Sequence, residues 1–541
     1  MHLLHKPGPA GRRRLRAAGG VCAVVGVALV VGCSSSGSPA KSNASAGASA
    51  GASAVPHSGG SLTVINNQGT GFDPAHNFIS SFTDGPAMEA IYGPGLLYEA
   101  DNGTIQMGFA TSLAGSNNNK TWTLKLHPGL KFSDGTAFNA KAVVDNLNRI
   151  ADPATASSEQ AVASTIKATA PNATTVVFTL QSANAQFPAL LSQDFSLIPS
   201  PTAVARYGAT YNVHPVGPGP FELQNLVPAV SETLVRNPNY KLFAPGQPYL
   251  DSITFEEVTD NSQAVADMST GQAQVDSDVI NGLLIQQMQG AGMTVIASHP
   301  VGGAWLDLNE SKPPFNNLLA REAVYLALNR AKVGQIWAQG NPASTNFYPT
   351  TSPYFDKKNN WPAQNTAKAQ QLFNQLAAEG HPVNFTILWP QGTYSAAAQY
   401  MASVLNGFKN VQVTTSIVLS PQYLEALNQT GDYQMTAYGF YNSQLFPTIS
   451  QIFSTGGALN FEKITDNKLN TAVLSMQNAK NPTAFKTASD TFLQELIAQY
   501  DIIPTQQGDI GYAYNPKDVA GVQVAEFGIP AFYGQMYLTN P

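Results

Sequence analysis

Residues 122–144 read WTLKLHPGLKFSDGTAFNAKAVV, and this stretch carries the most information about the fold. Its opening residues alternate between apolar and polar side chains, which predicts a strand with one buried face. The turn-forming pair at 128–129 separates this strand from residues 130–132, so we predict a β-hairpin. Apolar residues then recur at helical spacing over 140–150, ahead of Asp152-Pro153. The stretch therefore predicts a hairpin followed by a helix.

The same stretch resembles the pattern W-x-F-x-L-R-x-G-V-K-F-x-D-G-x-P-x-x-A-x-D-V of the family 5 extracellular solute-binding proteins. The main departures are His127, Ala137 and Ala142, which leave the spacing of the pattern intact. The resemblance extends over nearly the whole chain beyond the tether described below. Further matches to patterns of the family follow in the expected order at residues 60–64 with 72–74, 214–221, 234–240 and 312–330.

The resemblance implies an α/β chain with the two-lobed periplasmic-binding-protein fold, type II, cluster C, and an extra inserted domain. Two lobes would be joined by crossing strands, and a ligand would be enclosed when the lobes close over the cleft between them. We expect the following boundaries: lobe I at 59–97, 208–300 and 506–541, the inserted domain at 98–207, and lobe II at 301–505.

The first residues have the composition of an export signal. Residues 1–33 combine a basic start, an apolar run at 21–31 and small residues before Cys33. The run is shorter than the roughly 20 residues that a membrane-spanning helix needs. Val30-Val31-Gly32-Cys33 resembles a bacterial lipobox, which implies cleavage and lipidation at Cys33. Residues 34–58, rich in Ser, Ala and Gly, predict a flexible tether, so we expect anchoring to the outer face of the cytoplasmic membrane.

Composition argues against several other classes of protein. The net charge is -6 and 11% of residues are charged, so the composition does not indicate a basic surface that would bind nucleic acid. Both cysteines, Cys22 and Cys33, lie near the start, so the folded part has no disulfide or zinc framework. The histidines are scattered without metal-ligand spacing, and the G-x-S-x-G match at 47–51 lies in the tether. We therefore expect no cofactor, no metal and no enzymatic activity, with a secreted hydrolase as the least favoured alternative.

The ligand is less well defined by the sequence. Peptide binders of the family carry an aspartate in a G-W-x-x-D-Y/F motif that pairs with the peptide amino group, and Ser443 stands at that place in the segment 438–447. A buried ammonium group without a counter-charge is costly. We therefore expect binding to depend little on a free amino group, unless Asp432, Asp501 or another nearby carboxylate substitutes. The aromatic and polar residues of the segment suit a neutral or partly apolar ligand.

The resemblance thus implies a monomeric, exported binding protein that hands a peptide or related small solute to the membrane subunits of an ABC importer. The alternative is a non-peptide solute, such as a sugar, a glycoside or a metal chelate. The residues that we expect to contact the ligand are Phe78, Ser80, Phe82, Trp305, Phe440, Tyr441, Asn442, Ser443 and Gln506.

Overall fold

The structure of the chain is a computed structural model. The structure describes residues 56–66, 71–76, 85–100, 104–157, 159–193, 195–242, 246–279, 281–298, 300–338, 340–391, 395–442, 445–446, 448–457, 459–508, 510–523 and 532–540. Within these ranges, the side chains of 298, 420–421 and 440–442 are also outside the description. No helix in the described ranges is both long enough and apolar enough to cross a bilayer.

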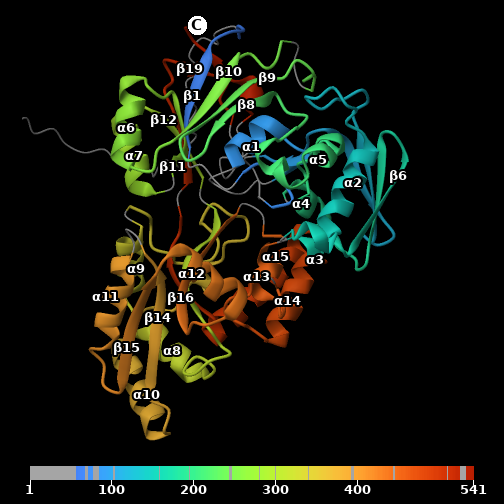
Figure 1. Cartoon of the computed structure of the whole chain (residues 1–541). Helices are drawn as coiled ribbons and strands as arrows, with labels where there is room; N and C mark the ends of the chain where they lie inside the picture. The colour runs from blue at the N-terminus through green and yellow to red at the C-terminus, as the bar shows by residue number, and fades with distance from the viewer. Residues whose placement is uncertain are drawn as a thin grey trace, which may run out of the picture. The chain divides into compact units, whose positions relative to one another are not determined.

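Lobe I is built on a seven-stranded mixed sheet. Its strands are β1 (Ser61–Asn66), β8 (Phe221–Val227), β9 (Ser231–Arg236), β10 (Ser252–Glu257), β11 (Val275–Val279), β12 (Thr294–Ser298) and β18 (Ile510–Tyr514), in the order β12-β18-β11-β1-β10-β9-β8. The central strand β1 runs parallel to β10 and β11, and the outer pairs are antiparallel. Helices α1 (Gly85–Tyr92), α6 (Asn261–Thr270) and α7 (Gly282–Gly290) lie in the same lobe (Figure 1). Their apolar side chains are buried in its cores.

Lobe II has a five-stranded sheet in the order β15-β14-β16-β13-β17. These strands are β13 (Val301–Leu308), β14 (Val383–Pro390), β15 (Val411–Val418), β16 (Met435–Asn442) and β17 (Ile502–Gln506). One apolar core lies between the sheet and the helices α8 (Leu318–Ala327), α9 (Arg330–Trp337), α10 (Thr366–Ala378) and α11 (Ser395–Leu405). A second core joins β13 and β17 to α13 (Thr448–Phe453), α14 (Asn467–Gln477) and α15 (Pro482–Gln499).

The inserted domain lies in the chain between α1 and β8. Its four-stranded antiparallel sheet has the order β4-β5-β7-β6, formed by β4 (Ala110–Ser116), β5 (Thr121–Leu126), β6 (Ile166–Asn172) and β7 (Thr175–Leu180). The helix α2 (Ala140–Ala151) contacts β6 and β7 (Figure 1). Shorter helices complete the domain: α3 (Gln160–Ala163), α4 (Phe187–Ser192) and α5 (Pro201–Tyr207). The expected α/β fold with an inserted domain is confirmed.

The strand and the helix predicted from residues 122–144 are present, but the predicted hairpin between them is wrong. Both edges of β5 are occupied, one by β4 and the other by β7. Residues 130–132 instead fold back on residues 136–138, with an isolated bridge between Lys131 and Ala137. Phe132 is buried against Phe138 in the core of the inserted domain, with ring centroids 5.3 Å apart. The segment therefore turns into the core and does not continue the sheet.

The chain passes between the two large sheets at adjacent places. β12 of lobe I leads into β13 of lobe II, and β17 of lobe II leads back into β18 of lobe I. The side chain of Gln507 donates a hydrogen bond from Nε2 to the carbonyl of Pro300, at 3.3 Å, which ties the two passages together. Beside them, Gly303 has φ +120°, and a Cβ there would lie 2.3 Å from the carbonyl oxygen of Gln506. This close approach of two backbones requires glycine.

Candidate functional site

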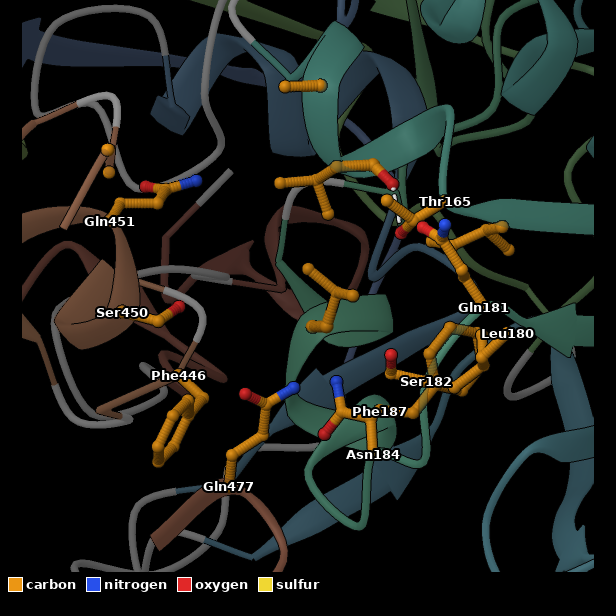
Figure 2. A pocket seen from close by; sticks show the side chains of 16 residues that line it. Thr165, Leu180, Gln181, Ser182, Asn184, Phe187, Phe446, Ser450, Gln451 and Gln477 are labelled. Carbon is orange, nitrogen blue, oxygen red and sulfur yellow. Dashed lines mark hydrogen bonds between the residues drawn. The ribbon is translucent and has the colours of Figure 1, made fainter. Parts of the chain in front are cut away.

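A pocket of about 370 Å³ lies between the inserted domain and the α13–α14 region of lobe II. Figure 2 shows Phe446, Ser450, Gln451 and Gln477 from lobe II facing a wall made by residues 165–187 of the inserted domain. The volume is within the range of about 300–1,000 Å³ that is usual for small-molecule sites. The pocket is therefore large enough for a small solute or for a part of a peptide.

The wall from the inserted domain is mainly apolar because it is the exposed edge of that domain's core. Phe187, at the start of α4, packs on Trp122 and Phe178, with ring centroids 5.7 and 5.2 Å away. This packing holds the start of α4 against the sheet of the inserted domain. The apolar lining residues of the inserted domain are Ala161, Val162, Ile166, Leu180, Phe187 and Leu190.

The polar lining groups are carboxamides and hydroxyls, and no lining residue is formally charged. The carboxamides of Asn184 and Gln477 point toward one another across the pocket in Figure 2. Oδ1 of Asn184 accepts a hydrogen bond from the backbone N–H of Gln186, at 2.8 Å, which holds this side chain in place. The backbone carbonyl of Gln477 accepts from the N–H of Ala185, at 3.2 Å, so the two walls also touch. Such groups can pair with the N–H and C=O groups of a neutral ligand.

Gln451 connects the pocket to a buried carboxylate. Its Nε2 group donates to both carboxylate oxygens of Glu159, at 3.3 and 3.2 Å. Glu159 precedes α3 in the inserted domain and is 6% exposed. Burial raises the pKa of Glu159, and the hydrogen bond from Gln451 opposes that shift.

Two of the residues predicted to contact ligand have fully described side chains, and both are buried on strands of the five-stranded sheet. Trp305 is 1% exposed and lies between Tyr438 and Phe453, with ring centroids 5.8 and 5.9 Å away. Gln506 ends β17 opposite Ala304 and is 2% exposed. Neither residue lines the pocket between the inserted domain and lobe II.

The other predicted contact residues are described only in part or not at all. Phe440, Tyr441 and Asn442 end β16, where they pair with Gly303, Gly302 and Val301 of β13, but their side chains lie outside the description. Phe446, which belongs to the same segment 438–447, does line the pocket. Four predicted contact residues and the predicted lipidation site lie outside the described residues: Phe78, Ser80, Phe82, Ser443 and Cys33.

The two carboxylates considered as substitutes for the missing aspartate have other partners. Asp432 is exposed and accepts a hydrogen bond from Nζ of Lys312, at 2.9 Å, which lowers its pKa. Asp501 is buried, with Oδ1 3.8 Å from Nη2 of Arg321. Burial and the neighbouring charge of Glu310 raise the pKa of Asp501. Neither carboxylate lines the pocket.

Most of the pocket could not be found from the sequence. Gln181, Asn184, Gln451 and Gln477 are ordinary surface residue types, and no motif marks them. They come together only because the inserted domain contacts lobe II, between residues nearly 300 positions apart in the chain. Within the described residues, no group of three or more His, Cys, Asp or Glu side chains is placed to hold a metal ion.

Comparison with known proteins identifies the family. Residues 104–461 match the family described as bacterial extracellular solute-binding proteins, family 5 Middle. The glutathione-binding protein GsiB of Shigella flexneri is 32% identical over 296 residues, which are 54% of this chain and 56% of that protein. The chain therefore spans little more than half the length of this curated relative.

Two solved structures have the same fold. The periplasmic binding protein DppA from Helicobacter pylori, in complex with the peptide STSA, has a TM-score of 0.76 at 21% identity, covering 90% of this chain and 99% of that one. The binding protein AgaA from A. tumefaciens R10, in complex with agropinic acid, has a TM-score of 0.75 at 19% identity, covering 88% and 99%.

These similarities confirm the type II periplasmic-binding-protein fold and the resemblance given by the motifs. The matched family consists of binding proteins and not of enzymes, as expected. With the match covering well over half of its length, the chain belongs to the family 5 bacterial extracellular solute-binding proteins.

Proposed function

We propose that this protein captures a peptide or a related small solute and delivers it to the membrane subunits of an ABC importer. The observation that carries the proposal is the pocket between the inserted domain and lobe II, with its apolar wall, carboxamides on both sides and no charged lining residue. A ligand there would contact both parts of the protein at once. Its binding energy would then favour the arrangement in which the two walls are close, which is the state that an importer can recognise.

A peptide is the first choice for the ligand. A peptide has alternating N–H and C=O groups, and carboxamides such as those of Asn184 and Gln477 can pair with either. The relative GsiB is named for binding glutathione, and DppA of similar fold holds a peptide. A non-peptide solute is the second candidate, because AgaA of the same fold holds agropinic acid.

We also propose export with lipid anchoring at Cys33, action as a monomer, and the domain boundaries given by the sequence. The lipobox-like residues 30–33 and the following small-residue tether support the anchor. The boundaries are supported by the chain leaving the seven-stranded sheet after β1, returning to it at β8, and crossing between the large sheets near 300 and 507.

Mass spectrometry tests the proposal directly. The chain without residues 1–33 is purified under native conditions, and the solute released by denaturation is identified. Titration calorimetry then measures its affinity for protein that has been stripped of ligand and refolded. We expect one solute per chain and no chemical change in the solute after long incubation. Conversion of the solute to a product would contradict the binding function, and the absence of any bound or bindable peptide or small solute would overturn the proposal.

A further inference from the structure

We propose that Glu159 is the anionic partner for an ammonium group of the ligand, reached from the pocket through Gln451. This inference rests on the proposed function and narrows the solute to one that carries an amine. It supplies the negative charge that the segment 438–447 lacks at Ser443. It also reverses the expectation, based on that segment alone, that a free amino group matters little.

The position of Glu159 is well defined by its surroundings. Its backbone N–H donates a hydrogen bond to Oγ of Ser157, at 3.2 Å. Among the described residues, its carboxylate accepts hydrogen bonds only from the side-chain amide of Gln451. The first contact is a local one in the inserted domain and holds the backbone, whereas the second comes from α13 of lobe II and reaches the carboxylate. The carboxylate is thus held at the junction of the two walls.

Within the described residues, the carboxylate of Glu159 has no ion-pair partner. No Lys, Arg or His among the described residues forms an ion pair with Glu159, although 6% exposure removes most of its contact with water. A buried carboxylate with only a neutral amide as partner is costly, and a cation would stabilise it. The amide contacts of 3.2 and 3.3 Å are also longer than the roughly 2.7–2.9 Å of a hydrogen bond between an ammonium group and a carboxylate. Glu159 is therefore better suited to an ammonium group than to its present partner.

The pocket gives access to Glu159. Gln451 lines the pocket, and so do Ala161 and Val162, which follow Glu159 by two and three positions. Gln451 has a long side chain with several rotatable bonds, so its amide can take another rotamer when an ammonium group replaces it at the carboxylate. A ligand in the pocket could then place its amine at the oxygens that Gln451 now occupies, while its uncharged part stays on the apolar wall.

The contact between Glu159 and Gln451 could also serve only to hold the two walls together. The Glu159→Gln variant separates this structural role from the binding of an ammonium group. The replacement keeps an oxygen that can accept the hydrogen bond from Gln451 but removes the charge. The exposed Glu379 at the end of α10 offers a matched control, since Glu379→Gln removes the same charge from a residue outside the pocket. Thermal melting of each variant checks that it is folded.

The test uses trialanine, Ala-Phe-Ala and trileucine, each with a free and with an acetylated amino group, and native mass spectrometry to count the bound forms. We expect the wild type and Glu379→Gln to prefer the free form about tenfold or more, and Glu159→Gln to show a ratio near one. Equal binding of both forms by the wild type would overturn the inference but leave the proposed function in place. An unchanged preference in Glu159→Gln would assign the amine to another residue and also overturn it.

Should the wild type bind none of these peptides, n-pentylammonium chloride and 1-pentanol decide the question. The ammonium salt should raise the melting temperature of the wild type more than 1-pentanol does, and more than sodium chloride does at the same concentration. In Glu159→Gln the three compounds should have equal effects. If the ammonium salt does not stabilise the wild type more than the alcohol does, the ammonium site is refuted. The proposed function has its own test, which is the identity of the solute that co-purifies.

Discussion

The indole Nε1 of Trp305 donates a hydrogen bond to Oδ1 of Asp307, at 2.8 Å, and the same N–H faces Oε1 of Glu462, 3.1 Å away. All three side chains are buried in lobe II. Burial raises the pKa of Asp307 to about 6 and that of Glu462 well above its ordinary range, with the charge of Asp307 as a further cause for Glu462. The two carboxyl groups therefore share a proton at neutral pH.

This pair predicts that stability falls as pH rises. The folded-state pKa of Asp307 is raised above its ordinary 3.8, so its neutral form is favoured by folding, and stability is lost as pH rises from about 4 through about 6. Asp307→Asn removes this loss and should melt roughly 2–4 °C above the wild type at pH 8, with little difference at pH 4. Melting temperatures measured from pH 4 to pH 8 test this.

The control for that experiment is Asp432→Asn. Asp432 is exposed and its pKa is lowered by Lys312, so its removal should give no gain in melting temperature at pH 8. A wild-type melting temperature that stays level from pH 4 to pH 8, or an Asp307→Asn variant that parallels the wild type, would show that Asp307 is ionised without cost.

Gln477→Ala tests the lobe II side of the pocket. Gln477 is half-buried and has no side-chain hydrogen bond among the described residues, so it is free to bind the ligand. Loss of one hydrogen bond of about 1 kcal/mol should raise Kd roughly five- to tenfold without changing the melting temperature of the ligand-free protein. Calorimetry with the co-purifying solute measures the change. Gln375→Ala, which alters an exposed glutamine of α10, should leave Kd unchanged; an equal effect in both variants would argue against the pocket.

Gly303→Ala tests the close backbone approach beside the crossing segments. Its φ of +120° and the 2.3 Å approach of a Cβ to the carbonyl of Gln506 both oppose a side chain, so β13 and β17 would have to separate. We expect a loss of about 2 kcal/mol or more in unfolding free energy. Gly129→Ala is the control: Gly129 also has a positive φ, +76°, but no atom lies within 4 Å of an added Cβ. This variant therefore measures backbone strain without a steric contact. Losses of equal size in chemical denaturation would mean that the steric contact is unimportant.

Cys33→Ala tests the anchor. The wild-type chain should incorporate a labelled fatty acid and fractionate with membranes, while the variant should carry no label and accumulate as a precursor or as free protein. Cys22→Ala is the matched control, because this cysteine lies within the apolar run and has no lipobox-like context. Label in Cys33→Ala, or its loss in Cys22→Ala, would place the lipid elsewhere.

The sequence predicted the fold better than the site. The alternation at 121–126 and the helical spacing at 140–150 follow from local periodicity, and both elements formed. The hairpin at 130–132 failed because one edge of β5 is taken by β4, which precedes it, and the other by β7, which follows α2 and β6 in the chain; neither strand lies within 122–144. Glu159 and Gln451 show the same limit, since they are 292 positions apart and meet only in the folded chain.

The central claim is that the solute binds between the inserted domain and lobe II, and hydrogen exchange with the co-purifying solute tests it most directly. Amide exchange is measured by mass spectrometry in stripped and in solute-saturated protein. We predict slower exchange on both walls together, in residues 159–190 and 446–477, when the solute is present. Protection that appears on neither wall while the solute is fully bound would contradict the account.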